Sequence, residues 1–275
     1  MAVQEEGSVL TARPALNFIG SGVSATDDAA NNRTNVTVAG GSGGGIALGL
    51  RSALPVSPGA AGSAFKCTDG PFVFISDGTA WKAFVFGYPV VEPILANYGW
   101  VNQGVATVSG AGGGVTLASM GNVGDNNRIL KLTAPGVPYT LTIAFAAQMV
   151  GYNYMGAGLC LRESSTGKFV AFKFGMNNGA QLLTETWANP TSFNAAVQNN
   201  PMAIGFGPML WLQVKDDGTN RLFNYSFDGV YFSLFRSEPR NTYMVPNELG
   251  VVMHAALGVP LLFAMHVNHW QVTTP

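Results

Sequence analysis

The side chains that could carry out acid–base chemistry are scattered along this sequence. Hydrolysis of a glycosidic bond needs two carboxylates on one face, about 5 to 9 Å apart, but the acidic residues here are isolated. Asp216, Asp217 and Asp228 fall at predicted turns, where their carboxylates can cap backbone N–H groups. The remaining candidates are four glutamates: Glu163, Glu185, Glu238 and Glu248. We therefore expect no catalytic residue and no enzyme activity, and polysaccharide hydrolysis is the less favoured alternative.

The three histidines do not form a metal-binding pattern. His266 and His269 lie in one predicted strand at an odd spacing, so we expect their side chains on opposite faces, which would prevent joint binding of a metal ion. His254 could reach one of them across a sheet. No Cys or carboxylate at a suitable spacing supplies a third ligand, and the sequence therefore predicts no zinc site.

Two further motif types are incomplete. The glycine runs at 40–45 and 110–114 lack the Lys-Ser/Thr that ends a phosphate-binding loop, and they do not precede a helix. Both are expected to be linkers or turns. Residues 125–127, Asp-Asn-Asn, could supply oxygen ligands to calcium, an alternative that the sequence leaves open. We expect no cofactor.

Two short segments combine aromatic and amide side chains. Sugar sites place an exposed aromatic ring for stacking beside Asn, Gln or Asp, on loops of a rigid scaffold. Trp187 is the favoured ring, because Trp211 and Trp270 lie in strand-like positions where burial is expected; the alternative is that Trp187 only covers an edge of the core. The candidate glycan contacts are Trp187, Asn189, Tyr152, Asn153 and Tyr154.

Residues 209–235, MLWLQVKDDGTNRLFNYSFDGVYFSLF, predict the scaffold most clearly. In the first part, apolar side chains alternate with Trp211, Gln213 and Lys215, as in a half-buried strand. Two Asp-Gly pairs then supply the positive φ of tight turns. The segment therefore predicts two antiparallel hairpins in succession.

The same alternation recurs over residues 93–275 and predicts an all-β domain. Roughly ten short strands fit two antiparallel sheets packed face to face, and no amphipathic helix or internal repeat is found. Besides the two hairpins, strands are expected at Ile129–Thr133, Tyr139–Phe145, Gly158–Arg162, Phe169–Phe174, Gln181–Thr186, Leu249–His254 and Leu261–Val272.

Two smaller regions precede this domain. Residues 51–92 contain a predicted hairpin, 72–75 with 79–86, whose aromatic residues are expected to pack between subunits or against the next domain. Residues 1–50 hold expected strands around Leu16–Ile19 and Asn35–Val38, and they are too short and polar to bury a core of their own. This arm is expected to complete its packing against other copies or another protein.

Two resemblances follow from these segments. The pattern W-L-x-V, turn, F-x-Y-S-x-D-G resembles the laminin G and concanavalin A-like jelly rolls of lectins and carbohydrate-binding modules, without the E-x-D-x-x-E or E-x-D-x-E of the laminarinase-like enzymes of that fold. The order L-N-F-I-G-S-G-V-x-x-T-D-D, then T-N-V-T-V, resembles the N-terminal segments of bacteriophage tail fibre and related virion appendage proteins. The cadence T-D-G-x-x-x-F-x-S-D-G-x-x-W is similar to a small β-module of phage fibres.

Composition limits the partners. The net charge is −1 and charged residues make up 11 % of the chain, so neither nucleic acid nor an anionic membrane is an expected partner. No basic and then apolar signal segment begins the chain, and no apolar run is long enough to insert into a membrane. Synthesis in a bacterial host cytoplasm is therefore expected, with Cys67 and Cys160 as reduced, buried thiols.

Together these features predict a structural protein of a bacteriophage virion. Residues 1–50 would attach a tail fibre-like appendage to other virion proteins, and the lectin-like sandwich would bind a host-surface glycan. A homotrimer would strengthen weak single sites through effective concentration. The alternative is a capsid or baseplate decoration or cement protein that binds only protein.

Overall fold

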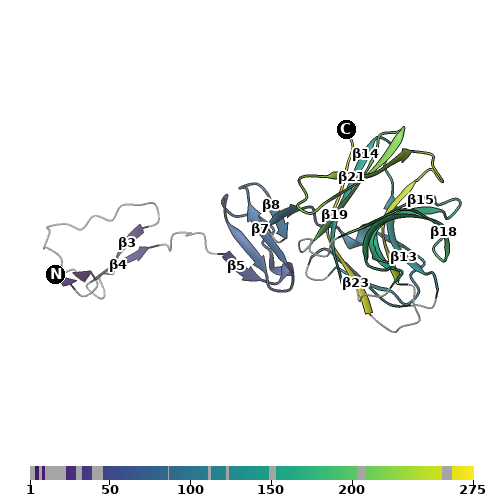
Figure 1. Cartoon of the computed structure of the whole chain (residues 1–275). Helices are drawn as coiled ribbons and strands as arrows, with labels where there is room; N and C mark the ends of the chain where they lie inside the picture. Colours follow the sequence, from purple (N-terminus) through teal and green to yellow (C-terminus); the bar gives the residue numbers. More distant parts are fainter. Residues whose placement is uncertain are drawn as a thin grey trace. The chain divides into compact units, whose positions relative to one another are not determined.

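The computed structural model divides the chain into two compact units, residues 1–45 and residues 46–275 (Figure 1). It describes residues 4–5, 8–9, 23–28, 33–38, 46–85, 87–110, 113–121, 124–148, 153–202, 209–255 and 262–275. In the first unit, β1 (Gln4–Glu5) pairs with β2 (Ser8–Val9), and β3 (Val23–Asp28) pairs with β4 (Arg33–Val38), both antiparallel. The strand expected at 35–38 therefore lies within β4, and the one expected around 16–19 lies outside the described residues.

The second unit begins with a five-stranded sheet, called the small sheet below. Its order is β5-β6-β7-β8-β9, with β5 and β6 parallel and the other pairs antiparallel. The expected hairpin is confirmed as β7 and β8, and Asp77 Oδ1 closes its turn by accepting from the backbone N–H groups of Thr79 and Ala80. The strands are β5 (Ile46–Gly49), β6 (Ala64–Cys67), β7 (Phe72–Ser76), β8 (Trp81–Val85) and β9 (Tyr88–Val90).

Two seven-stranded antiparallel sheets follow and form a sandwich, which confirms the all-β prediction. The β15 sheet has the order β10-β13-β22-β15-β16-β17-β18: Gly99–Val101, Asn127–Thr133, Glu248–Ala255, Met155–Arg162, Phe169–Met176, Ala180–Asn189 and Ser192–Pro201. The β14 sheet has the order β11-β12-β23-β14-β19-β20-β21: Thr107–Ser109, Val115–Met120, Leu262–Thr273, Tyr139–Gln148, Leu210–Asp216, Asn220–Ser226 and Ser233–Pro239. Figure 1 shows the strong curvature of the β15 sheet around β13, β15 and β18.

The main core fills the space between these two sheets. Alternate apolar side chains of each strand point inward, and Phe172 of the β15 sheet packs against Phe223 and Phe235 of the β14 sheet with ring centroids 5.6 and 5.4 Å apart. Polar side chains of the β14 sheet are thereby left on the face turned away from this core, its outer face.

The two predicted hairpins are confirmed, because β19 pairs with β20 and β20 with β21. Gly218 and Gly229 supply the expected positive φ, +91° and +72°. The strand expected from Val230 begins only at Ser233. Asp228 Oδ1 accepts the N–H groups of Val230 and Tyr231, which holds both residues in the turn.

Helical structure in the described part of the chain consists of two short 3-10 turns, η2 (Arg51–Ala53) and η3 (Leu95–Asn97). Consequently no helix of the described residues has the length and apolar character needed to span a membrane. Cys67 and Cys160 are both free and buried, as expected.

Candidate functional site

The favoured stacking residue, Trp187, is not exposed: only 1 % of it is accessible, so the expectation of an exposed ring at this position is wrong. Its ring stacks on Phe169 with centroids 5.8 Å apart, and its Nε1 donates to Glu185 Oε2 over 3.0 Å. The cause is the curvature of the β15 sheet, which brings Asn127 at one end of β13 to Pro190 after β17, where the backbone N–H donates to the carbonyl oxygen over 2.8 Å. Trp187 belongs to the interior of the curved sheet.

The other candidates are dispersed. Asn189 accepts the backbone N–H and the hydroxyl of Thr191, so its side chain stabilises its own turn. Asn153, just before β15, exchanges hydrogen bonds with Asn178 in the turn between β16 and β17. Tyr154 is 57 % exposed, and Tyr152 lies outside the described residues. Sugar contact by Asn153, Tyr154 and Asn189 stays a prediction, and the structure does not bring them together with Trp187 into one exposed site.

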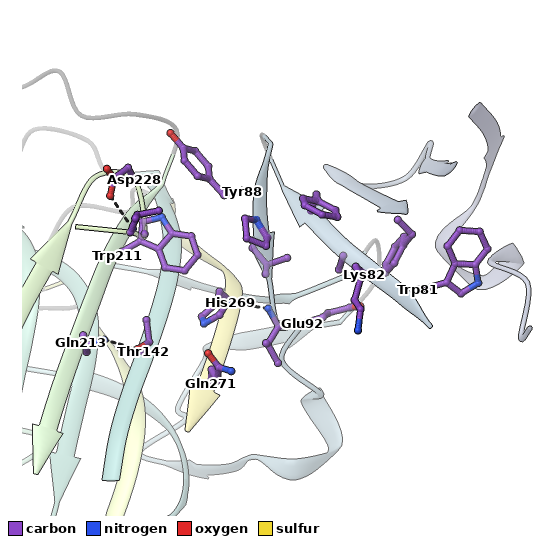
Figure 2. A pocket seen from close by; sticks show the side chains of 18 of the residues that line it. Trp81, Lys82, Tyr88, Glu92, Thr142, Trp211, Gln213, Asp228, His269 and Gln271 are labelled. Carbon is purple, nitrogen blue, oxygen red and sulfur yellow. Dashed lines mark hydrogen bonds between the residues drawn. The ribbon is translucent and has the colours of Figure 1, made fainter. Parts of the chain in front are cut away.

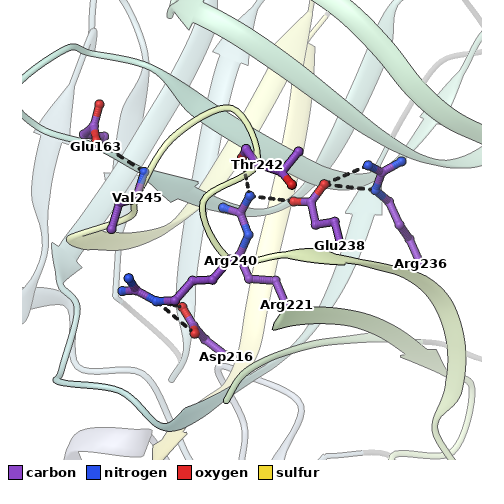
Figure 3. Close-up of polar contacts among 8 residues, drawn as sticks. All are labelled: Glu163, Asp216, Arg221, Arg236, Glu238, Arg240, Thr242 and Val245. Carbon is purple, nitrogen blue, oxygen red and sulfur yellow. Dashed lines mark hydrogen bonds and ion pairs between the residues drawn. The ribbon is translucent and has the colours of Figure 1, made fainter. Parts of the chain in front are cut away.

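The four isolated glutamates are held by partners. Figure 3 shows Glu238 between Arg221 and Arg236, with N–O distances of 2.6 and 2.7 Å. Glu163 accepts the hydroxyl of Thr166 and the backbone N–H of Val245. The remaining contacts join Glu185 to Lys173, and Glu248 to Lys131 and Arg162. Each of the four carboxylates therefore has a structural partner within the fold.

One prediction about the histidines is wrong. Ala144 of β14 pairs with His269, Ala146 pairs with His266, and the register shifts between them because Asn268 of β23 forms a bulge. An extra residue restores the same orientation, so both histidines lie on the outer face of the β14 sheet. Within the described residues, however, no three His, Cys, Asp or Glu side chains are placed to hold a metal ion.

A groove lies between the small sheet and the outer face of the β14 sheet, with a cavity volume of about 890 Å³. Figure 2 shows Trp211, His269 and Gln271 on the sandwich strands, opposite Tyr88 and Glu92. Phe72, Phe74 and Trp81 of the small sheet belong to one apolar cluster with Trp211, so for these residues the structure agrees with the second alternative, packing against the next domain. The volume is within the usual range for a small-molecule site.

The sandwich wall of this groove is built from two rows of side chains across β23, β14 and β19. Trp211 and His269 both pair with Ala144, and the small methyl group between them lets the rings approach to 4.8 Å between centroids. At the next position on the same face, two residues along each strand, Gln213 and Gln271 both pair with Thr142. Gln213 donates to the Thr142 hydroxyl over 3.1 Å, and Gln271 is exposed. An aromatic row therefore lies beside an amide and hydroxyl row.

The opposite wall comes from β9 and the chain that follows it. Tyr88 approaches Trp211 edge to face, with ring centroids 6.4 Å apart. The backbone N–H of Val91 donates to His269 Nδ1 over 2.9 Å, and the N–H of Trp270 donates to the Val91 carbonyl. These two bonds fix the chain after β9 on β23 and set the width of the groove.

The turn after β20 forms the rim. Its Gly229 lies against the Trp211 indole so closely that a Cβ there would be 2.7 Å from the ring. Tyr231, between two residues that line the groove, is 80 % exposed. The rim turn therefore exposes an aromatic side chain, although Tyr231 itself is not one of the residues that line the cavity.

The groove carries little free charge. Arg51 pairs with Glu92 over 2.7 Å, and Lys82 pairs with Asp77 over 3.2 Å. Burial lowers the pKa of His269 to about 4, so its imidazole is neutral at pH 7. The arrangement suits an uncharged ligand with apolar faces and hydroxyl or amide groups.

Two alternation patterns in the sequence are a signal for this site. The alternation of 209–235 places Trp211, Gln213 and Lys215 away from the core, and that of 139–145 does the same for Thr140 and Thr142. Each pattern marks the polar face of one strand. The two faces indicate a shared site only when the strands are known to be neighbours in the sheet. That β14 pairs with both β19 and β23 could not be deduced from the strand pattern.

Comparisons with known proteins give fold likeness alone. No protein family model and no curated protein matches the chain. A functionally unknown protein from Saccharomyces cerevisiae is similar at TM-score 0.49 and 17 % identity, covering 66 % of this chain and 99 % of that one. The VIP36 exoplasmic/lumenal domain, in its Ca2+/Man3GlcNAc-bound form, gives 0.48 and 6 %, covering 68 % and 87 %. A carbohydrate binding module from Bacillus subtilis gives 0.46 and 12 %, covering 64 % and 96 %. At these TM-scores the likenesses carry no functional argument.

Proposed function

We propose that this protein binds a glycan in the groove between the small sheet and the β14 sheet. The observation that carries the proposal is the groove lining, in which the half-buried rings of Tyr88 and Phe232 accompany the amide and hydroxyl row of Gln213, Thr142 and Gln271. A sugar ring presents C–H groups on its faces and hydroxyls around its edge, which aromatic rings and amides respectively recognise.

The proposal is one of binding without turnover. The carboxylates lining the groove, Glu92 and Asp228, are engaged by Arg51 and by backbone N–H groups of the rim turn. Neither is arranged as an acid paired with a second free carboxylate, which glycoside hydrolysis needs. Release of reducing sugar from a bound polysaccharide would overturn this part of the proposal.

The test is a glycan array with the intact chain, followed by calorimetric titration of the best oligosaccharide. Tyr88→Ala removes a ring from the groove wall, and Gln271→Ala removes an exposed amide. Each is expected to weaken binding at least about tenfold. Tyr154→Ala removes an exposed ring outside the groove and is expected to leave affinity unchanged. Equal loss in all three variants, or loss only in Tyr154→Ala, would place the ligand elsewhere.

We further propose that the protein is a trimeric virion appendage of a bacteriophage, anchored by residues 1–50. The support is the resemblance of the N-terminal sequence pattern to tail fibre proteins, together with the β3–β4 hairpin in that region. Light scattering should give three times the chain mass of 28.8 kDa, and antibody labelling of virions should mark the tail. A monomeric mass or unlabelled particles would contradict this placement.

Binding to protein alone is the second candidate. It is favoured by the edge strand β5, where Ile46 and Leu48 are 55 % and 67 % exposed, and by the neighbouring Leu50, which is 56 % exposed. An exposed apolar edge of this kind can pair with another chain. If no glycan on the array exceeds background, and Leu48→Lys abolishes incorporation into particles, this candidate replaces the first.

A further inference from the structure

The small sheet has a second face, turned away from the cluster that packs with Trp211. In β6 and β7 the buried side chains of Phe65, Phe72 and Phe74 belong to that cluster, so the residues that alternate with them lie on the opposite face. The register continues this opposite face into β5, because residues paired across neighbouring strands share a face. Six residues form it and are called the outer patch: Ile46, Leu48, Ala64, Lys66, Val73 and Ile75.

The outer patch is apolar and exposed. Ile46, Leu48 and Ile75 are 55 %, 67 % and 38 % exposed, and Lys66 is the one charged member. A sheet with one solvated face usually carries polar side chains on that face, whereas strands buried on both faces have continuous apolar runs. Strand β7 begins with such a run, Phe-Val-Phe-Ile at 72–75. The patch therefore has the composition of a surface that another surface covers.

The charge of the outer patch limits what can cover it. Nucleic acid and anionic membranes are bound by clustered Lys and Arg side chains, and the patch has Lys66 alone. Lys66 pairs in register with Leu48 on one side and Val73 on the other, so apolar side chains flank its aliphatic stem. An apolar protein surface is the matching partner, and contacts between identical chains are more apolar than transient contacts.

The small size of the outer patch favours a tethered partner over a free one. Three strands about 4.8 Å apart, each contributing about four residues of 3.3 Å, span roughly 10 by 13 Å. A stable contact between free proteins buries about 800 Å² of accessible surface on each partner, which is more than this patch provides. A separate protein would therefore bind it weakly, whereas copies of the chain that are already held together need less area.

The order of the chain supplies such a tether. Ile46, the first residue of β5, directly follows the glycine-rich stretch at 40–45 and lies in the segment 1–50 that is proposed to anchor the protein. Six residues reach at most about 20 Å. Arms of several copies that attach at one point would therefore keep the outer patches near one another, at a high effective concentration.

From these features we infer that the outer patch is the contact between copies of this chain, with Ile46, Leu48 and Ile75 buried against the same patch of the neighbouring copies. The inference rests on the proposed arm-anchored oligomer and names the surface that joins its copies. It is independent of glycan binding, because none of the six residues lines the groove.

The test measures dissociation of the oligomer by sedimentation over a dilution series of the intact chain. The double variant Leu48→Gln with Ile75→Gln places two amides in the outer patch and is expected to raise the dissociation constant at least about tenfold. Leu234→Gln is the matched control, since Leu234 is 57 % exposed on the edge strand β21, and it should leave the constant unchanged.

The outcomes separate this inference from the proposed trimer. A trimer that withstands the double substitution as well as the control overturns the inference and leaves the proposed trimer intact. A dimer that the double variant dissociates supports the inference and overturns the trimer. A chain that stays monomeric at every concentration overturns both.

A measurement on the unsubstituted protein covers the case in which the double variant does not fold. Hydroxyl radicals label accessible leucine side chains, and mass spectrometry reports the label at each residue. In a single chain Leu48 and Leu234 have similar exposed fractions, 67 % and 57 %, so we expect several-fold less label on Leu48 than on Leu234 in the oligomer. Equal labelling would contradict the inference, and so would protection of Leu48 that requires a different virion protein.

Discussion

The backbone N–H of Val91 donates to Nδ1 of His269 over 2.9 Å, although 178 positions separate the two residues. This bond ties the chain leaving the small sheet to the last strand of the sandwich. It also fixes the tautomer of the imidazole that lines the groove. The small sheet is therefore one wall of the proposed binding site as well as a neighbour of the sandwich.

The first prediction concerns the pH dependence of stability. In the folded protein, burial lowers the pKa of His269 from 6.5 to about 4, whereas the unfolded chain binds a proton below about pH 6.5. Its contribution is therefore present above pH 6.5 and is lost as the pH falls from 6.5 to 4. The loss is on the order of 3 kcal/mol at most.

The measurement is urea unfolding of the wild type and of His269→Asn from pH 4 to 7. The pKa values of His254 and His266 are also lowered, chiefly by burial, but both residues are common to the two proteins. The variant should have the flatter dependence of unfolding free energy on pH. Parallel curves for the two proteins would show that the fold does not lower the pKa of His269.

The second prediction concerns the rim turn. Gly229 has φ of +72° and would place a Cβ 2.7 Å from the Trp211 ring. Gly229→Ala should lower both the unfolding free energy and glycan affinity, because Trp211 has to move. Gly124→Ala is the control, since Gly124 has φ of +80° and no atom of the described residues lies within 4 Å of the position that a Cβ would take. We expect Gly229→Ala to cost at least about 1 kcal/mol more than the control; equal costs would contradict the close contact.

The third prediction concerns the charge network at one end of the sandwich (Figure 3). Arg221 is fully buried, contacts Glu238 and donates to the Thr242 carbonyl over 2.6 Å. Arg221→Met leaves a buried carboxylate with fewer partners, and we expect a loss of about 3 to 5 kcal/mol in unfolding free energy. Lys82→Met breaks the exposed pair with Asp77 and should cost less than about 1 kcal/mol. Similar losses in chemical denaturation would refute this ranking.

The fourth prediction separates structural from ligand roles for Trp187. Trp187→Phe removes the bond from Nε1 to Glu185 and should lower the unfolding free energy by about 1 to 3 kcal/mol. Glycan affinity of the folded variant should stay unchanged, because the ring is buried in the curved β15 sheet. Calorimetric titration decides: reduced affinity at full folding would restore Trp187 as a ligand contact.

The fold was largely predictable because its signals are local. Asp217 Oδ1 accepts the N–H groups of Thr219 and Asn220, so the first Asp-Gly pair forms the turn that the sequence indicates. Strand β18 was not predicted, since it lies at the edge of its sheet and its residues are mostly exposed. An edge strand of this kind lacks the alternation on which the prediction depends.

The site was less predictable because it depends on distant pairing. The burial of Trp187 follows from sheet curvature, which joins Asn127 to Pro190 and leaves no periodic trace in the sequence. The position of His266 relative to His269 follows from a bulge at Asn268, which strict alternation cannot anticipate. The groove itself needs the small sheet to pack on Trp211, and composition does not specify that contact.

The most direct test of glycan binding in the groove is a crystal structure of the intact chain with its tightest oligosaccharide. Density for a sugar is expected in the groove beside Tyr88, with an edge of the sugar directed toward Gln271. Density beside Tyr154, or at any site outside the groove with the groove filled by solvent alone, would contradict the account.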